Sequence, residues 1–292
     1  MPLILGVHVS RSSKVLDDKK SVDMSDAIIR DLDILGLNAA QIFTHGPRFI
    51  VENKMDYKKI INNCPDIDLS VHSAYPSVNI WKITKENIND KSSKKFTSDI
   101  EVQLNACKKI NAWGLVLHIT KQLPKQVAYV MNKVLKPISI KHNVKIILEM
   151  VSNKSADDTY ETPDKINYLT SLLDHKEDWW CWCVDTAHLW GAGVDIRSYS
   201  NMKKWINNIK HPKKIEMFHL NGSSAKLGSG SDKHEIPFCS DDLIWCNVDP
   251  NKSGLRSIVE FSVKNNITII CEINRGVESD VIKCMEIIKN FE

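Results

Sequence analysis

Six short apolar runs of the sequence end in side chains that can bind a metal ion. If these runs are parallel strands of one barrel, their ends lie at the same mouth and the side chains converge. A lone histidine at a strand end usually has a structural role, but three carboxylates and three imidazoles buried together without a cation would cost several kcal/mol. The pattern therefore favours a site for more than one metal ion. The six residues are His72, His118, Glu149, Asp185, His219 and Glu272.

Two shorter motifs add three potential ligands to this set. Asp185 is followed three residues later by His188, and Asp232 and His234 are alternate residues of one polar segment, so each pair can reach one side. Each motif alone is weak, because polar loop residues are usually exposed and have no such role. Nine oxygen and nitrogen ligands without a thiolate suit two or three zinc ions, with manganese or iron as lesser alternatives. Metal clusters of this size stabilise the attacking and leaving oxygens of phosphoryl transfer, so we expect phosphodiester hydrolysis.

Eight short apolar runs provide the strands that would carry these residues. Continuous apolar runs, rather than alternating apolar and polar residues, are typical of parallel strands covered on both faces. The segments between the runs have the apolar spacing of helices, as in Met24, Ile28, Leu32 and Leu35. The eight runs are Leu3 to Val9, Ala39 to Phe43, Leu69 to His72, Gly114 to His118, Lys145 to Glu149, Trp182 to Asp185, Ile215 to His219 and Ile267 to Glu272.

The alternation of strand and helix along the whole chain predicts the fold. Eight such units without a Gly-, Pro- or Ser-rich linker indicate an α/β fold, a single (β/α)8 TIM barrel that forms one domain over residues 1–292. A helix that begins near Pro124 is expected to end at Pro137. Segments 75–95 and 221–254 are predicted to be long loops, which we place at the C-terminal face of the barrel with the functional site.

Composition says little about the partner. A formal net charge of +3 over 292 residues is too small to indicate a nucleic-acid ligand. The eight cysteines are scattered, without a paired CxxC pattern, so we expect reduced and mostly buried thiols. There is no secretory signal and no apolar stretch of about 18 residues, so we expect an intracellular, soluble monomer without membrane contact. Its compartment would be the cytoplasm or nucleus, or the virus factory or virion of a virus.

Three sequence motifs resemble those of the endonuclease IV family, the barrel-type apurinic/apyrimidinic (AP) endonucleases of bacteria, yeast and some large DNA viruses. The motifs are HSAY at 72–75, VDTAH at 184–188, and HLN at 219–221 continued by GSGSDKHE at 228–235. The similarity covers the whole chain, from GVHVS at 6–10 to CEINRG at 271–276. All nine ligand positions of the family are filled. The resemblance implies the same barrel and the same reaction, cleavage of the DNA backbone beside a missing base.

The resemblance also implies how the ligands are shared among three zinc ions per chain, for which manganese can substitute. Glu149 would bridge the first two ions, and Glu149 and Glu272 are the predicted catalytic residues. A hydroxide held by those two ions would attack the phosphorus 5′ to the abasic sugar, and the third ion would neutralise the departing 3′ oxygen. The products would be a 3′-hydroxyl and a 5′-deoxyribose phosphate, as in base excision repair. The implied ligands are His72, His118 and Glu149 for the first ion, Glu149, Asp185, His219 and Glu272 for the second, and His188, Asp232 and His234 for the third.

Four residues are predicted to contact double-stranded DNA at the abasic site. The segment FTHGPR at 43–48 resembles the family's loop that enters the minor groove, and Arg48 matches its inserted arginine. Tyr75 matches the aromatic residue of a second penetrating loop, and Asn274 and Arg275 follow the last predicted strand. Such wedges suit a site without a base, because it is already partly unstacked and costs least to kink.

Three loops depart from the family pattern. Pro76 follows Tyr75 where the family commonly has leucine, and Gly222 follows Asn221 where it has aspartate. The glycine-rich stretch that the family has after His234 is replaced here by CSDD at 239–242. We expect the phosphate contacts of these loops to differ from the family's, while the metal ligands are unchanged.

Two other functions are compatible with the sequence. A sugar isomerase or epimerase has a similar barrel with metal ligands at its strand ends, but it generally needs fewer ligands, so one or two metals per chain would favour it. A protein that binds damaged DNA without cutting it, and holds zinc only for structure, belongs to a different class. Nicking of a duplex with one tetrahydrofuran site separates this binder from an enzyme.

Overall fold

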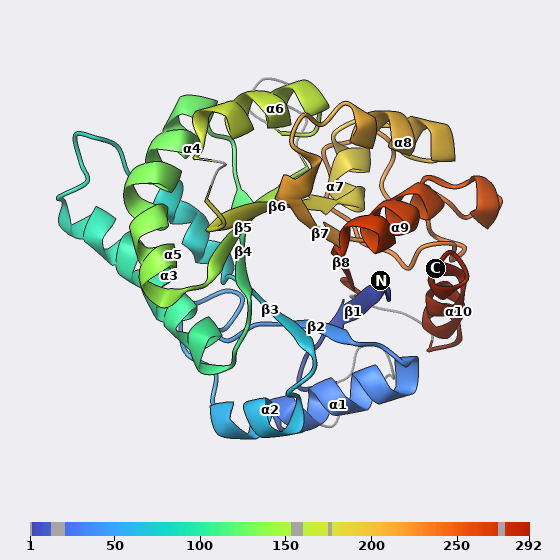
Figure 1. Cartoon of the computed structure of the whole chain (residues 1–292), viewed down its shortest axis with the longest axis horizontal. Helices are drawn as coiled ribbons and strands as arrows, with labels where there is room; N and C mark the ends of the chain where they lie inside the picture. The colour runs from blue at the N-terminus through green and yellow to red at the C-terminus, as the bar shows by residue number, and fades with distance from the viewer. Residues whose placement is uncertain (1, 13–20, 153–159, 175–176, 274–277) are drawn as a thin grey trace.

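Eight parallel strands close into a barrel in which each strand pairs with its neighbours in sequence, and β8 pairs with β1 (Figure 1). The computed structural model describes residues 2–12, 21–152, 160–174, 177–273 and 278–292. This architecture confirms the predicted TIM barrel. The strands are β1 (Ile4–His8), β2 (Ala39–Ile42), β3 (Asp68–His72), β4 (Gly114–Ile119), β5 (Lys145–Met150), β6 (Trp180–Asp185), β7 (Ile215–His219) and β8 (Thr268–Cys271).

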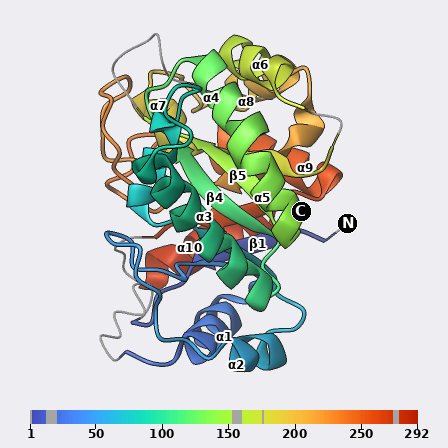
Figure 2. The same cartoon turned by 90° about the vertical axis from the view of Figure 1, so that its left-hand side faces the viewer.

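Helices cover the outer side of the ring of strands, as two perpendicular views show (Figure 1, Figure 2). Helices α1 and α2 lie side by side in both views. The α-helices are α1 (Met24–Leu35), α2 (Tyr57–Asn63), α3 (Lys91–Lys109), α4 (Pro124–Val130), α5 (Lys136–His142), α6 (Pro163–Leu172), α7 (Thr186–Gly191), α8 (Tyr199–Asn207), α9 (Gly254–Asn265) and α10 (Glu278–Lys289). Shorter helical turns are η1 (Tyr75–Lys82), η2 (Met131–Leu135), η3 (Pro212–Lys214) and η4 (Pro250–Lys252).

The ends of α1 show how the local sequence sets an element. Asp23 precedes the helix, and its carboxylate accepts a hydrogen bond from the backbone N–H of Ser25. Gly36 follows the helix with a φ of 60°, a left-handed conformation that glycine adopts without steric cost. Between them, Ile28 and Leu32 belong to the buried face, as the helical spacing predicts. The helix therefore begins and ends where its sequence signals lie.

The prediction that a helix ends at Pro137 is wrong. The helix continues from α4 through the π-helical turn η2 into α5, which ends at His142. In that turn the N–H of Lys136 donates to the carbonyl of Met131, five residues earlier. Pro137 then occupies the first turn of α5, where a missing N–H is tolerated, so the wider turn accommodates the proline without ending the helix.

Apolar side chains fill the barrel interior beneath the strand ends. The residues of this interior cluster are fully buried and come from six strands. Gly6 lets β1 and β2 lie close together, because a Cβ on it would lie 2.1 Å from the carbonyl oxygen of Ala39. All eight cysteines are free thiols and six are buried, as predicted. The interior cluster consists of Ala39, Val116, Ile147, Cys181, Cys183, Met217 and Ile270. The interior is therefore a packed core, and the polar side chains gather at one mouth.

Two long connections follow β3 and β7. The first contains η1 and ends where α3 begins at Lys91, slightly before the predicted end of the loop. The second runs from 220 to 253 and contains the turn η4, in agreement with the predicted irregular segment. Among the residues placed in the structure, no helix has both the length and the apolar character needed to cross a lipid bilayer.

Candidate metal centre

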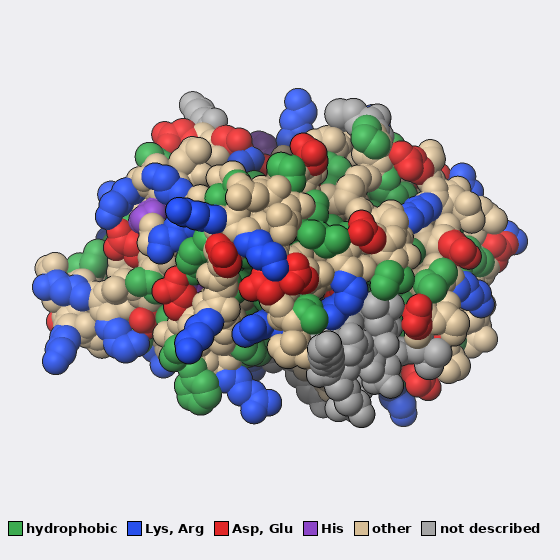
Figure 3. Space-filling model, turned by 90° about the horizontal axis from the view of Figure 1, so that it is seen from below, with side chains coloured by type: hydrophobic (Ala, Val, Ile, Leu, Met, Phe, Trp, Pro, Cys, Tyr) green, Lys and Arg blue, Asp and Glu red, His purple; other side chains and the backbone are tan. Residues whose placement is uncertain are grey.

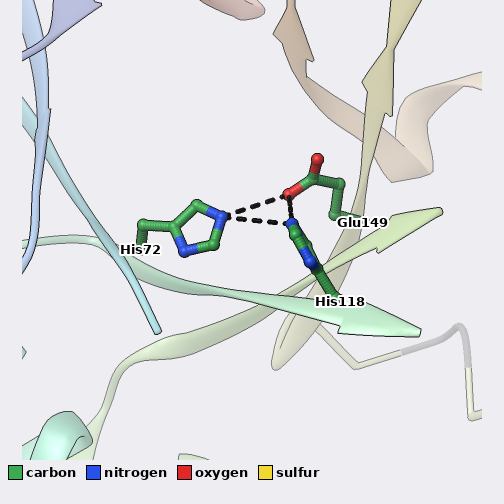
Figure 4. A group of neighbouring side chains, drawn as sticks. All are labelled: His72, His118 and Glu149. Carbon is green, nitrogen blue, oxygen red and sulfur yellow. Dashed lines mark hydrogen bonds and ion pairs between the residues drawn. The ribbon is translucent and has the colours of Figure 1, made fainter. Parts of the chain in front are cut away.

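His72, His118 and Glu149 bring three potential ligand atoms together at the ends of neighbouring strands (Figure 4). His72 ends β3, and His118 and Glu149 are paired residues near the ends of β4 and β5. The Nε2 atoms of the two histidines are 3.2 Å apart, and Glu149 Oε2 lies 3.5 Å from His72 Nε2 and 3.0 Å from His118 Nε2. A tetrahedral ion with bonds of about 2.0–2.1 Å would hold its ligand atoms roughly 3.3 Å apart. The spacing fits one metal ion.

A second group of ligand atoms adjoins the first and shares Glu149 with it. Asp185 and His219 are paired residues at the ends of β6 and β7, and Glu272 directly follows β8. His219 Nδ1 lies 3.2 Å from Glu149 Oε1, 3.4 Å from Glu272 Oε2 and 3.8 Å from Asp185 Oδ2. Glu149 thus presents Oε2 to the first group and Oε1 to the second.

His188, Asp232 and His234 form a third group. His188 belongs to α7, and the other two residues come from the long connection after β7. Asp232 Oδ1 lies 2.8 Å from His234 Nε2 and 3.3 Å from His188 Nε2. Asp185 Oδ2 lies 3.8 Å from His234 Nε2, so it lies between the second and third groups, whereas the resemblance implied it only for the second. All nine predicted ligand side chains are therefore gathered at one mouth of the barrel.

Several buried polar atoms of the cluster lack hydrogen-bond partners within the described part of the chain. They are both carboxylate oxygens of Glu149, Nδ1 of His219 and both ring nitrogens of His234. Buried polar groups are almost always satisfied, because an unsatisfied one loses its hydration without compensation. A cation would satisfy the acceptors of this set. The His/Asp/Glu groups therefore fit metal ions.

Hydrogen bonds fix the orientation of three imidazole rings. In each ring, one nitrogen contacts a protein oxygen and the other faces the cluster, so the neutral form of the ring would keep its proton on the contacting nitrogen and offer a lone pair to a metal ion. The three contacts are His72 Nδ1 with the carbonyl of Ser73 (2.8 Å), His188 Nδ1 with the carbonyl of Met150 (2.7 Å), and His219 Nε2 with Oε1 of Gln41 (3.0 Å).

The opposite charges of the cluster shift the pKa values of its members. Burial raises the pKa of Glu149, but the imidazoles of His118 and His219 outweigh this effect and hold that pKa well below its usual range. Burial lowers the pKa of His234, but the carboxylates, with Asp185 the strongest, raise it to about 9. Without a cation the cluster is therefore a network of carboxylates and imidazolium groups, and a metal ion must displace protons to bind.

Comparison with known proteins agrees with this arrangement. Residues 29–282 match the family described as Xylose isomerase-like TIM barrel. The African swine fever virus protein named "Probable AP endonuclease" (isolate Warthog/Namibia/Wart80/1980) is 30% identical over 250 residues, which are 82% of this chain and 79% of the viral protein. This chain belongs to the endonuclease IV family.

Other relatives support the same assignment. The protein named "Probable endonuclease 4" of Mycoplasmopsis agalactiae (strain NCTC 10123 / CIP 59.7 / PG2) is 31% identical over 224 residues, 74% of this chain and 71% of the bacterial protein. The crystal structure of AsfvAP:AG superposes with a TM-score of 0.81 at 26% identity, and the match covers 98% of this chain and 96% of that chain. The fold and the endonuclease IV family predicted from the sequence are both confirmed.

Two polar residues outside the predicted set, Gln41 and Asn221, contact the candidate metal ligands. Gln41 donates through Nε2 to Glu272 Oε1 at 2.9 Å, while its Oε1 contacts His219. Asn221 donates to Asp185 Oδ2 at 2.7 Å and accepts the backbone N–H of Glu272 at 2.9 Å. The sequence signals were present, because Gln41 interrupts an apolar run and Asn221 lies two residues after His219.

An open cavity of about 740 Å³ lies over the cluster, and Arg48 and Tyr75 belong to its lining. Tyr75 is 51% exposed, and its ring centroid lies 6.0 Å from that of His72. The structure thus places two of the predicted DNA-contacting residues at the rim of the site. Asn274 and Arg275, the other two, lie outside the described residues.

The charge of the face seen from below is mixed, because Lys and Arg side chains are interspersed there with Asp and Glu (Figure 3). This distribution agrees with the small net charge of +3.

Proposed function

We propose that this protein is a zinc-dependent AP endonuclease that hydrolyses the phosphodiester 5′ to an abasic site in double-stranded DNA. The products are a 3′-hydroxyl and a 5′-deoxyribose phosphate, and the role is base excision repair. The observation that carries the proposal is the gathering of nine ligand side chains in three adjacent groups beneath one open cavity. The relatives named AP endonuclease and endonuclease 4 support DNA as the substrate.

The three groups would hold three zinc ions, with manganese as a substitute. Imidazole and carboxylate ligands at these spacings suit zinc. When bound, the ions supply Lewis acidity toward the phosphate and lower the pKa of an attacking water. The ligands are His72, His118 and Glu149, then Glu149, Asp185, His219 and Glu272, then His188, Asp232 and His234 with Asp185 beside them.

Glu149 and Glu272 are the carboxylates that we assign to catalysis. Glu149 holds the first two groups side by side, because its two oxygens face different groups. Oε2 of Glu272 contacts His219, and its Oε1 accepts a hydrogen bond from Gln41, so contacts to both oxygens fix the orientation of the carboxylate. Both residues act on the reacting phosphate by keeping the metal positions fixed relative to one another.

Arg48 and Tyr75 would contact the DNA around the abasic sugar. Both line the cavity, and Tyr75 exposes half of its side chain there. An aromatic ring and a guanidinium can stack on or replace bases next to the gap in the stack. Asn274 and Arg275 complete the proposed contact set. We infer that one protein chain acts on one site as a monomer.

A sugar isomerase is a weaker alternative. Such an enzyme needs fewer ligands, whereas here Asp232 lies 2.8 Å from His234 and 3.3 Å from His188 and so completes a third group. This third group has a clear role only when a phosphate with both an attacking and a leaving oxygen is bound.

A nicking assay with metal analysis tests the proposal. The substrate is an end-labelled duplex with one tetrahydrofuran residue, and the control is the same duplex without it. We expect one cut on the 5′ side of the tetrahydrofuran, a 3′-hydroxyl end that a polymerase extends, and loss of the cut after treatment with a chelator. Absence of cutting by protein that holds its metals contradicts an enzyme and favours a DNA binder.

A further inference from the structure

The connection between β7 and α9 carries two of the proposed zinc ligands, although its residues 220–249 form no helix or strand. Asp232 and His234 must nevertheless be held within a few tenths of an ångström to bind an ion together with His188. Because this part of the connection has no regular secondary structure, contacts of its side chains and backbone must hold the two ligands in place.

Asp242 is a fully buried carboxylate at the centre of this connection. Each of its oxygens accepts two backbone N–H groups. Oδ1 accepts those of Ser223 (3.0 Å) and Ile244 (2.9 Å), and Oδ2 accepts those of Phe238 (2.9 Å) and Trp245 (3.1 Å). One side chain thus joins the beginning and the end of the segment that carries the ligands.

Two backbone features depend on this carboxylate. A Cβ on Gly222 would lie 2.7 Å from Cγ of Asp242, so only glycine lets the chain approach so closely. Phe238 has a φ of 66°, an uncommon left-handed conformation for a residue with a side chain, and its N–H is one of the four that Asp242 accepts. The hydrogen bond offsets the cost of this conformation.

Gly222 connects Asp242 with the ligand pair. The backbone N–H of Gly222 donates to the carbonyl of Glu235 at 2.8 Å, and the N–H of Glu235 donates back at 3.0 Å. His234 immediately precedes Glu235, and Asn221, which contacts Asp185, immediately precedes Gly222. Asp242 therefore holds Ser223, the neighbour of Gly222, and Gly222 is hydrogen-bonded to the residue that follows His234.

A second bond ties the same connection to the helix that supplies His188. Trp190 in α7 donates through Nε1 to the carbonyl of Ala225 at 2.7 Å, and the N–H of Ala225 contacts the hydroxyl of Ser223. Ser223 is also one of the residues held by Asp242. The network thus reaches the backbone next to His234 and the helix that carries His188.

We propose that Asp242 is the positioning residue of the third zinc site. The inference rests on the proposed function, because it concerns one of the three zinc ions. Asp242 acts through the backbone of the connection and touches neither the metal nor the substrate. The ligands of the first two groups lie on or directly after strands, so we expect these groups to depend on Asp242 less than the third group does.

Zinc content of the Asp242→Asn variant tests this inference. An amide can accept at only one of its two positions, so two of the four N–H bonds are lost. After dialysis against metal-free buffer, we expect three zinc ions per wild-type chain and two per D242N chain. The zinc affinity of the third site should fall about 10- to 100-fold, as is typical when a group that orients a ligand is removed. Excess zinc should restore nicking.

Asp68→Asn is the matched control. Asp68 is a mostly buried carboxylate at the opposite end of β3 from His72, where it accepts hydrogen bonds from Trp113 and Thr268. A loss of stability without loss of zinc is expected for it. If D242N does not fold, Gly222→Ala tests the same contact, because its Cβ would displace the carboxylate.

The outcomes separate the inference from the proposed function. Three zinc ions with unchanged affinity in folded D242N or G222A overturn the role of Asp242 and leave the proposed function intact. Fewer than three zinc ions in the wild type contradict the proposed function, and the inference fails with it. Hydrogen exchange gives a readout independent of activity: two amides that share one oxygen of Asp242, either those of Ser223 and Ile244 or those of Phe238 and Trp245, should lose protection in D242N and keep it in D68N.

Discussion

The backbone N–H of Tyr75 donates a hydrogen bond of 2.8 Å to the carbonyl oxygen of Pro47. The bond joins the loop after β2 to the start of η1, so Arg48 and Tyr75 are held at the same rim of the cavity. Two segments that are distant in sequence therefore form one rigid edge above the metal centre. This edge is where we expect damaged DNA to be recognised.

Removal of either side chain from this edge should weaken recognition and leave the metal centre intact. Tyr75→Ala should reduce affinity for an abasic duplex about 10-fold, since stacking on an aromatic ring is worth about 1–3 kcal/mol. Arg48→Ala should have a similar effect. Fluorescence anisotropy at one fixed salt concentration measures the affinity. Tyr168→Ala, which removes an exposed tyrosine on α6, is the control. Equal affinity of the wild type for damaged and intact duplex would refute the recognition role.

Loss of either carboxylate that we assign to catalysis should abolish nicking while the barrel stays folded. Glu149→Ala removes a ligand from two groups, and Glu272→Gln removes the charge that faces His219, so we expect a decrease of more than about 100-fold in kcat. Glu216→Gln, which changes a glutamate at the start of β7, should retain activity. Circular dichroism checks the fold. Normal nicking by either site variant would reject these assignments.

Gln41 should control zinc affinity without binding zinc. Gln41→Ala leaves His219 and Glu272 without their common partner, and we expect about a 10- to 100-fold lower zinc affinity. Gln41→Glu should lower the zinc affinity further, because it places a second carboxylate against Glu272. Competition with a fluorescent chelator measures both. Asn38→Ala is the control, since Asn38 binds backbone groups of Leu3 and Leu5 at the other end of β1. Equal zinc affinity in Q41A and wild type would be evidence against this role.

Zinc affinity should rise with pH. In the metal-free protein, burial lowers the pKa of His219, but Cys183, Glu272 and Glu149 raise it well above its usual value. Nearby carboxylates, with Asp185 the strongest, likewise outweigh burial and raise the pKa of His234 to about 9. Below these values protons compete with the metal, so binding releases protons and weakens as the pH falls. Apparent zinc affinity should therefore increase from pH 6.5 to about 9 and then level off. Chelator competition across this range measures it, and an affinity independent of pH would contradict the proposed ligand states.

Much of the barrel and its mouth could be predicted from the sequence. Continuous apolar runs reveal buried parallel strands, and a barrel brings the end of each strand to one mouth, so His72 and His219 could be placed together from their positions alone. The π turn before Pro137 could not be predicted in this way. It depends on one hydrogen bond, from Lys136 to Met131, whose register is set by packing rather than by a local signal.

The contacts that orient the candidate ligands could not be predicted from the sequence either. Gln41 reaches His219 and Glu272 only because closure of the barrel brings β2 near β7 and β8. Asp242 acts on backbone amides, which every residue carries, so no side-chain pattern identifies its partners. Sequence patterns thus indicated which residues are candidate metal ligands, while the residues that orient them could be identified only from the structure.

The division of the Glu149 carboxylate between two groups has a consequence for assembly of the centre. An ion bound in one group would fix the orientation of the shared carboxylate, so its other oxygen would already be in position to bind an ion in the adjacent group. Loading should therefore be cooperative. Under zinc limitation, molecules would divide into filled and empty populations instead of sharing the ions evenly.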